Sequence, residues 1–232
     1  PLLSAGYKHA AQVLGDLRGV EVYAIQGNFH NLPRYTGLFQ GTGRRLCCMF
    51  GGTFSNLDNE LMFLRNTLSV FSEGDMLLLN LPTVYAPAND PAAILQRDRV
   101  FARRSSDGSS TPAPRMQEFV GGVFKRHVRG LRGVRLEPCL DTNACPVPGS
   151  YAVDVRAHVR LMRGAEREFS TYYSRRYDPE GLNEFMAENG WKPVRYWRYA
   201  ADSHARPVCD LFLLYRKNES GQRTLRPNAP RS

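Results

Sequence analysis

The residues best able to bind a small ligand follow the ends of two apolar runs. The segment 27–29, Gly-Asn-Phe, follows the run at 20–25, and the segment 51–56, Gly-Gly-Thr-Phe-Ser-Asn, follows the run at 45–50. Glycine lets a backbone come close to a ligand, and an asparagine amide both donates and accepts hydrogen bonds. The asparagine of each segment also fits a plain role, at a strand exit or as a helix cap.

The sequence contains no other familiar catalytic arrangement. It has no Gly-x-Ser-x-Gly, no phosphate-binding P-loop and no His-Glu-x-x-His. The histidines lack the spacing of a metal site or a catalytic dyad: His30, His127, His158 and His204. We therefore expect structural or surface histidines and no metal ion.

Four of the five cysteines form two pairs along the chain. Cys47 and Cys48 lie in an apolar run and are predicted to be buried thiols. Cys139 and Cys145 could form a local bridge or half of a metal site, but no second Cys/His pair completes such a site. An odd cysteine count without a visible signal peptide favours a reducing, cytoplasmic setting.

The net charge of +9 is spread over the chain, mostly as arginine, with no block of five basic residues. This pattern favours solubility and a diffuse positive field over nucleic-acid binding. The field would also attract an anionic substrate or an acidic part of the same protein. No run of 18 apolar residues is present, so no membrane span is predicted.

The first third of the chain alternates between expected helices and strands. In order these are a helix at 7–17, a strand at 20–25, a polar loop, a strand at 45–50, a helix at 57–71 and a strand at 75–81. The strand at 45–50 is expected to be buried on both faces, and Ser55 or Asn56 to cap the helix after it. This alternation is typical of a parallel α/β core.

The rest of the chain first leaves and then rejoins that core. A helix opening at Asp90-Pro91, a loop at 104–114, a helix at 115–129 and alternating strands over 134–174 form an expected insert at 83–174. A helix from Asp178-Pro179 to Gly190 and strands at 194–199 and 208–215 then close the core. The polar tail at 217–232 is expected to be disordered.

These pieces together resemble the histidine-specific, S-adenosylmethionine-dependent methyltransferases, which include the enzyme that trimethylates histidine in ergothioneine biosynthesis. The resemblance spans roughly residues 5–216 and rests on the segments 27–29, 50–56, 71–79, 90–91, 174–177 and 190–197 and on Phe119. The Gly-Gly-Thr-x-x-Asn element is fairly specific, whereas Gly-Asp-Met-Leu-Leu-Leu is shared by many methyltransferases. The implied fold is a Rossmann-like class I methyltransferase core, residues 1–82 and 175–216, with a substrate-binding insert at 83–174.

The resemblance assigns roles to individual residues. It implies that Asn28, Phe29 and Gly51 contact the cofactor. It also implies a set of substrate contacts: Asn56, Tyr172, Ser174 and Asp98. Asn28 stands where the family has an acidic residue, and its amide can still bond the adenine amino group.

Three positions depart from the family pattern around the acceptor side chain. Tyr172 replaces a glutamate that reads the imidazole, Asp98 falls where the family has tyrosine, and Val155 falls where it has methionine. A tyrosine cannot accept an imidazole N–H as strongly as a carboxylate. We therefore expect an amino acid or related small amine other than histidine as the acceptor.

The family's main cofactor loop is absent from the sequence. That Gly-rich turn follows the first strand, and an acidic residue after the second strand binds the ribose. Both would lie upstream of Pro1, and Gly41-Thr-Gly43 cannot replace them because it precedes a strand. Because the chain also begins without Met, we expect it to be part of a longer protein and to bind S-adenosylmethionine weakly without an upstream segment or another chain.

Methyl transfer to an amine needs alignment and an unprotonated nitrogen, but no metal. Asp98, Tyr172 and Tyr173 are the candidates for handling the proton, and no feature of the sequence selects among them. Two alternatives stay open. One is a non-catalytic or split-partner module of the same fold, and the other is a basic nucleic-acid-binding protein.

Overall fold

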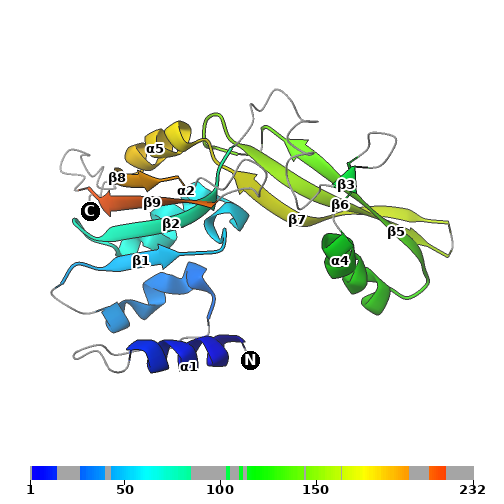
Figure 1. Ribbon diagram of the computed structural model, residues 1–232, viewed down its shortest axis with the longest axis horizontal. Coiled ribbons are helices and arrows are strands. Elements are labelled where there is room, and N and C mark those ends of the chain that lie inside the picture. The colour runs from blue at the N-terminus through cyan, green and yellow to red at the C-terminus, as the bar shows by residue number, and fades with distance from the viewer. Residues whose placement is uncertain are drawn as a thin grey trace, which may run out of the picture.

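The computed structural model describes residues 2–14, 27–39, 43–84, 103–104, 110–111, 114–143, 145–162, 164–198 and 209–217. Its elements are α1 (Leu2–Leu14), η1 (Phe29–Phe39), β1 (Leu46–Met49), η2 (Phe54–Asn56), α2 (Glu60–Met62), η3 (Phe63–Thr67), η4 (Leu68–Val70), β2 (Met76–Pro82), β3 (Arg103–Arg104), β4 (Ser110–Thr111), α4 (Pro114–His127), β5 (Leu131–Asp141), β6 (Tyr151–Leu161), β7 (Glu166–Arg176), α5 (Pro179–Glu188), β8 (Trp191–Trp197) and β9 (Cys209–Arg216). Figure 1 shows two bodies, with β1, β2, β8 and β9 in one and β5, β6 and β7 in the other. None of the described helices is long and apolar enough to cross a membrane.

A four-stranded mixed sheet of order β1-β2-β9-β8 forms the first body. β1 and β2 run parallel, and the helical segment from η2 to η4 connects them. β9 pairs antiparallel with both β2 and β8. A parallel pair joined through helix is the unit from which Rossmann-like sheets are built, so the α/β fold class predicted from the sequence is confirmed.

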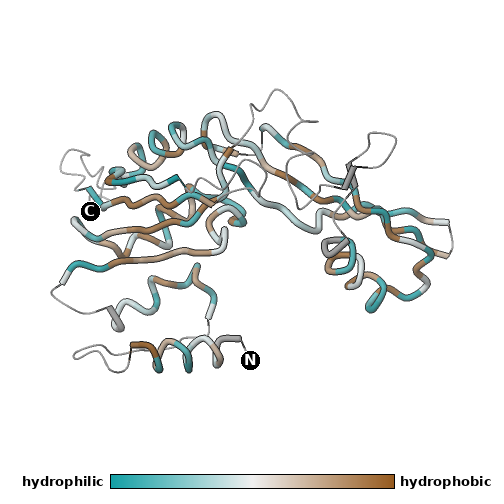
Figure 2. The backbone as a smooth tube through the Cα atoms, viewed as in Figure 1, coloured by the Kyte–Doolittle hydropathy of each residue, from teal (hydrophilic) through white to brown (hydrophobic). Residues whose placement is uncertain are grey.

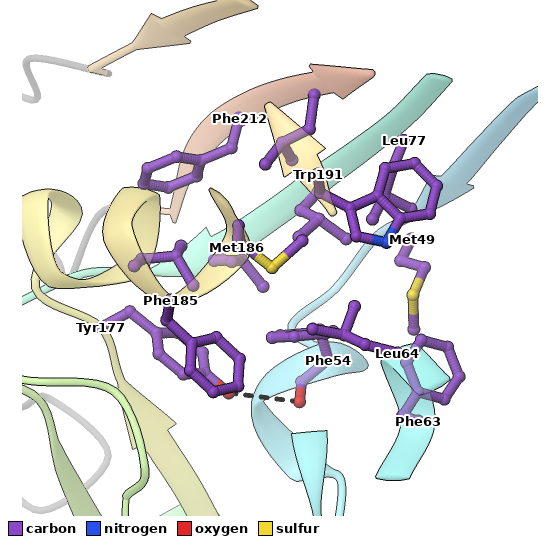
Figure 3. Close-up of a cluster of buried hydrophobic side chains, with 14 of the residues drawn as sticks. Met49, Phe54, Phe63, Leu64, Leu77, Tyr177, Phe185, Met186, Trp191 and Phe212 are labelled. Atoms are coloured by element: carbon purple, nitrogen blue, oxygen red, sulfur yellow. Dashed lines mark hydrogen bonds between the residues drawn. The ribbon is translucent and has the colours of Figure 1, made fainter. Parts of the chain in front are cut away.

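The core of this body lies between the sheet and the helical segments on one of its faces. Buried and half-buried residues alternate along most of β2, and Leu77, Leu79 and Leu81 are fully buried. Figure 3 shows Trp191, Met186 and Phe54 meeting in this core from β8, α5 and η2. Hydrophobic residues are concentrated along β1, β2 and β9, as Figure 2 shows.

The second body is an antiparallel sheet of order β5-β6-β7, with α4 in contact with β5. The central strand β6 is the most buried of the three, and Tyr151, Val153 and Val155 are fully covered. The predicted helix at 115–129 and the alternating strands over 134–174 are confirmed by α4 and by β5 to β7. The predicted helix after Asp178 and the two closing strands are confirmed by α5, β8 and β9. The Asp178 carboxylate caps α5 by accepting from the Gly181 N–H at 2.8 Å.

The end of β7 joins the two bodies. Tyr177 forms a parallel bridge with Thr83, in which its N–H donates to Pro82 O at 3.0 Å and its carbonyl accepts from Val84 N at 2.9 Å. The last residues of β7 and the end of β2 are thereby held side by side. This junction positions the site described below.

The predicted helix at 57–71 is present only in irregular form. A short 3-10 turn, one α-turn, a π-turn and a second 3-10 turn follow one another from Phe54 to Val70. The predicted caps, Ser55 and Asn56, are wrong, because both lie in the first 3-10 turn. Asn59 caps the α-turn instead, and its Oδ1 accepts from the Met62 N–H at 2.9 Å.

The predicted burial of 45–50 is also wrong. Within the described sheet, β1 has β2 as its one neighbour and lies at the edge. Leu46 is therefore 56% exposed and Cys48 is exposed, while Cys47 is half-buried. Only Met49 of this strand is buried in the core.

Several further expectations concern loops. The segment after Asn28 forms η1 instead of a polar loop, and short strands β3 and β4 pair where 104–114 was expected to be irregular. α1 overlaps the first expected helix. The expected strand at 20–25, the helix at 90–91, Asp98 and most of the polar tail lie outside the described residues.

Candidate functional site

A pocket of about 150 Å³ opens where the two bodies meet. Its lining comes from the turn after β1, from η2, from the end of β2, from the end of β7 and from the start of β9. The lining residues are Gly51, Gly52, Ser55, Asn56, Pro82, Tyr172, Ser174, Arg176 and Cys209. The pocket thus lies beyond the carboxyl ends of the parallel strands β1 and β2, where open α/β sheets commonly bind ligands.

The glycine turn gives this pocket an open backbone wall. Gly51 and Gly52 have φ angles of +68° and +73°, a region that other residues rarely adopt. A Cβ on Gly51 would meet no atom within 4 Å, so a ligand can approach this backbone closely. The Gly51 N–H donates to Asn80 Oδ1 at 3.3 Å, which ties the turn to β2.

A directed chain of hydrogen bonds crosses the floor of the pocket. Arg176 Nη1 donates to Ser174 Oγ at 2.8 Å, and Ser55 Oγ donates to Gly52 O at 2.6 Å. The two serine hydroxyls are 3.3 Å apart. Because the Ser55 proton is directed at Gly52 O, Ser174 is the donor between the two serines. The chain connects β7 to the glycine turn.

Arg176 is the charged residue of the lining and was missed by the sequence reasoning, which singled out only Ser174 of this segment. The side chain is 3% exposed, yet it borders the pocket. Successive strand residues point to opposite faces. With Ser174 at the site, the alternation would have placed Tyr172 and Arg176 beside it and Tyr173 and Arg175 on the other face.

The other face of the β7 end carries a buried network. Arg175 Nε lies 3.0 Å from Glu60 Oε1, and the Tyr177 hydroxyl donates to the same oxygen at 2.7 Å. The Arg175 guanidinium also donates to the carbonyls of Leu57 and Asp58. Burial raises the pKa of Glu60, and the bonds from Tyr177 and Arg175 oppose that shift. This network fixes β7 against the helical segment and so holds two pocket walls together.

A second buried carboxylate lies behind the pocket. Asp210 Oδ2 accepts from Thr83 Oγ1 at 2.9 Å and from the Tyr196 hydroxyl at 2.5 Å. The neighbouring Cys209 is exposed to the pocket, and burial raises its thiol pKa although the Arg176 charge opposes the shift. The thiol is therefore mostly protonated near neutral pH and poorly suited to act as a nucleophile.

The structure brings together four of the seven residues that the sequence singled out. Gly51, Asn56, Tyr172 and Ser174 line the same pocket, and Asn56 is exposed. Tyr172 pairs across the strands with Val155, another position that departs from the family pattern.

Two of the singled-out residues, Asn28 and Phe29, do not line this pocket. Asn28 Oδ1 accepts from the His30 N–H at 2.9 Å, which is a local turn bond. The Phe29 ring is 44% exposed and lies 5.8 Å from the Phe63 ring. Asp98 lies outside the described residues. Tyr173 belongs to the opposite face of β7, where its ring stacks under the Arg175 guanidinium at 4.8 Å.

The bridge considered between Cys139 and Cys145 is not formed, because both are free thiols. Burial raises the pKa of Cys145 to about 11. Among the described residues, no group of three or more His, Cys, Asp or Glu side chains is arranged to hold a metal ion.

No protein-family model and no curated protein sequence matches this chain. Solved structures that resemble it are methyltransferases. A S-adenosylmethionine-dependent methyltransferase from Clostridium acetobutylicum is 8% identical, with a TM-score of 0.39 over 91% of this chain and 71% of that one. The glycopeptide N-methyltransferase MtfA, complexed with S-adenosylmethionine, is 12% identical, with a TM-score of 0.41 over 94% and 69%. The sugar N-methyltransferase KedS8 from a Streptoalloteichus species is 12% identical, with a TM-score of 0.33 over 93% and 69%.

Proposed function

We propose that this protein is an S-adenosylmethionine-dependent N-methyltransferase whose acceptor is an amino acid or a related small amine. One observation carries the proposal. Residues that the sequence resemblance assigns to ligand binding, Gly51 and Asn56 on one segment and Tyr172 and Ser174 on another, line a single pocket. Ser55 and Ser174, 119 positions apart, meet in its floor.

The pocket's size favours the acceptor as its occupant. Sites for drug-sized ligands and cofactors usually hold roughly 300–1,000 Å³. A pocket of about 150 Å³ is smaller than such sites, which favours a small amine as its occupant.

The neighbouring surface fits the cofactor. Gly51 leaves its backbone open to a ligand. The Phe29 ring contacts the His30 and Phe63 rings but is still 44% exposed, and its exposed part could stack against a base. Asn28 Oδ1 accepts from the His30 N–H and has a second lone pair that could accept from the adenine amino group. S-adenosylmethionine, when bound, supplies an activated methyl group that the acceptor nitrogen takes with its lone pair while the carbon–sulfur bond breaks.

The chain's own residues would align and deprotonate the acceptor. The Asn56 amide can hold the polar end of an amino acid, and the Ser55–Ser174 pair fixes the floor beneath it. Tyr172 lines the pocket, and its hydroxyl would accept a hydrogen bond from the attacking amine or pass its proton to water. Asp98 stays a second candidate for this step.

The proposal also includes the family type, the substrate-binding insert, the source of the cofactor loop and the cellular setting. We propose that the chain is of the histidine-specific type that its motifs resemble, with Tyr172 predicting an acceptor other than histidine. The region 83–174 would act as the substrate-binding insert, an upstream segment or another chain would supply the Gly-rich cofactor loop, and a cytoplasmic setting stays a prediction.

The test uses the protein produced from its full reading frame. Calorimetry with S-adenosylmethionine should show saturable binding, and label from its methyl group should appear on an added amino acid or small amine. Binding without transfer to any amine would favour the non-catalytic module. Absence of both binding and transfer would contradict the proposal.

A further inference from the structure

We propose, independently of the catalytic function above, that this protein binds the surface of an anionic lipid membrane through the outer end of its second body. The surface that would make this contact, the tip patch, combines exposed basic and exposed apolar side chains. They come from α4, from the segment that follows it and from the turn between β6 and β7. The members of the tip patch are Phe119, Val123, Lys125, Arg126, Arg129 and Met162.

The tip patch lies at the far end of the second body from the pocket. β7 reaches the pocket with its last residue, Arg176, so the turn before its first residue, Glu166, lies at the other end of an 11-residue strand, roughly 33 Å away. In that turn the Met162 N–H donates to the Gly130 carbonyl at 2.8 Å, which holds the turn against the segment that leaves α4. Figure 1 shows α4 and this end of the sheet away from the first body. A partner bound there would leave the pocket open.

Basic residues are concentrated in this part of the chain. Residues 119–136 include five Lys and Arg residues and no Asp or Glu, a local charge of +5 in a chain whose net charge is +9. Lys125, Arg126 and Arg129 are exposed. Glu118 and Glu166 border this region, but they are fewer than the basic residues between them. The tip patch therefore attracts an anionic partner.

Large apolar side chains are exposed in the same region. Phe119 is 74% exposed, Val123 56% and Met162 66%. Phe119, Val123 and Arg126 occur at i, i+4 and i+7, so they lie along one face of α4. Val120, on the neighbouring face, is buried. Single exposed apolar residues are common, but apolar residues grouped with cations on one helix are typical of helices that lie in a membrane interface.

This combination fits an anionic bilayer better than a nucleic acid. Lys and Arg attract anionic headgroups, and neighbouring apolar side chains enter the boundary between headgroups and acyl chains. A nucleic acid would engage the cations and stack on the Phe119 ring, but it would give Val123 and Met162 no apolar surroundings. α4 has 14 residues, which is too short to cross a bilayer, so it would lie along the surface.

Flotation with lipid vesicles tests the inference on the unaltered protein. We expect binding to vesicles of equimolar phosphatidylcholine and phosphatidylserine, and roughly tenfold or more weaker binding to vesicles of phosphatidylcholine alone. Added salt should weaken the binding, because exposed charges are screened. The assay requires neither S-adenosylmethionine nor an acceptor.

A charge variant locates the cationic part of the surface. Lys125→Gln combined with Arg126→Gln should weaken binding to the anionic vesicles roughly 25-fold, since each basic residue near such a surface contributes about fivefold. Arg65→Gln combined with Lys192→Gln is the matched control, because both residues are exposed and belong to the first body. The control should bind as the unaltered protein does.

An apolar variant separates the bilayer from other anionic partners. Phe119→Ser should weaken vesicle binding about tenfold, because an inserted aromatic side chain is lost. Val194→Ser, at a residue that is 51% exposed on β8, is the control and should have no effect. All of these side chains are exposed, so circular dichroism should show an unchanged fold. If a variant does not fold, the two vesicle compositions still decide on the unaltered protein.

Three results would overturn the inference. They are equal binding to neutral and anionic vesicles, equal losses in the tip-patch variants and their controls, and binding of double-stranded RNA by a protein that does not bind vesicles. Absence of methyl transfer would contradict the function proposed above and would leave vesicle binding to decide this inference.

Discussion

The two adjacent arginines at the end of β7 are equally buried but have opposite surroundings. Arg175 is 4% exposed and faces the Glu60 carboxylate, two backbone carbonyls and the Tyr173 ring. Arg176 is 3% exposed and borders a pocket whose described lining carries no carboxylate. The two adjacent side chains therefore border different parts of the protein, Arg175 the buried Glu60 network and Arg176 the pocket.

The two faces of strand β7 therefore have different roles. The face of Tyr173, Arg175 and Tyr177 holds the inserted sheet to the core. The face of Tyr172, Ser174 and Arg176 supplies a wall of the pocket. Changes on the first face should affect stability, and changes on the second should affect ligand binding.

The largest effect is expected for Arg175→Met. Removing one partner of a buried ion pair leaves the other charge uncompensated and typically costs about 3–5 kcal/mol. We expect a loss of that size in the free energy of unfolding, measured by urea denaturation. Arg167→Met, an exposed arginine on the same strand, is the control and should change stability by less than about 0.5 kcal/mol. A loss below about 1 kcal/mol for Arg175→Met would contradict the anchoring role.

Asn56→Ala should affect catalysis more than stability. Asn56 is exposed and lines the pocket, and loss of one or two bonds to a charged acceptor group costs about 1.5–3 kcal/mol, or roughly ten- to a hundredfold in kcat/KM for the acceptor. The KM for S-adenosylmethionine should change little. Unchanged kcat/KM for the acceptor, or a loss confined to the cofactor, would refute the assignment of Asn56.

Tyr172→Glu should change which acceptor is used. A carboxylate at this pocket position can accept an imidazole N–H as a charged partner. We expect kcat/KM for histidine to rise about tenfold, while that for the preferred acceptor falls. Tyr172→Gln is the control without charge. An unchanged kcat/KM for histidine would mean that the residue at position 172 does not bind the acceptor side chain.

The smallest effect concerns the far end of the parallel pair. Burial raises the pKa of Asp75, but bonds from the Arg45 side chain and from the Arg45 and Ser72 N–H groups outweigh it, so the pKa is lowered. A lowered folded pKa stabilises the fold above the usual carboxyl value near 3.8, and that stability is lost as the pH falls through the folded pKa. Asp75→Asn should therefore cost about 1 kcal/mol at pH 7 and almost nothing in strong acid. A cost independent of pH would exclude the charged bond, and acceptor use should be unaffected at either pH.

Part of the site could be predicted from the sequence because its residues occur in short patterns. The Gly-Gly-Thr-x-x-Asn segment and the Tyr-x-Ser segment were named, and both line the pocket. The alternation of side chains along a strand shows that Arg176 shares a face with Ser174. It does not show that this face meets Gly51, which only the fold reveals, and Arg176 was therefore missed.

The misses in the fold have a similar cause. The leucine spacing at 57–71 marks buried positions, and Leu64 and Leu68 are buried, but spacing does not reveal the change from α-turn to π-turn at Phe63. The burial of Cys48 depends on which strands flank β1, and hydropathy carries no such information. The local bond from the His30 N–H to Asn28 Oδ1 is likewise not apparent from the sequence pattern, and the cofactor contact of Asn28 stays a prediction.

The acceptor profile of the unaltered protein tests the central claim most directly. It consists of kcat/KM for label transfer from S-adenosylmethionine to each common α-amino acid, histidine included. The pocket of Asn56, Tyr172, Ser174 and Arg176 predicts that an α-amino acid other than histidine gives the highest value. Transfer to none of them, or a maximum at histidine, would contradict the account of how this pocket binds its acceptor.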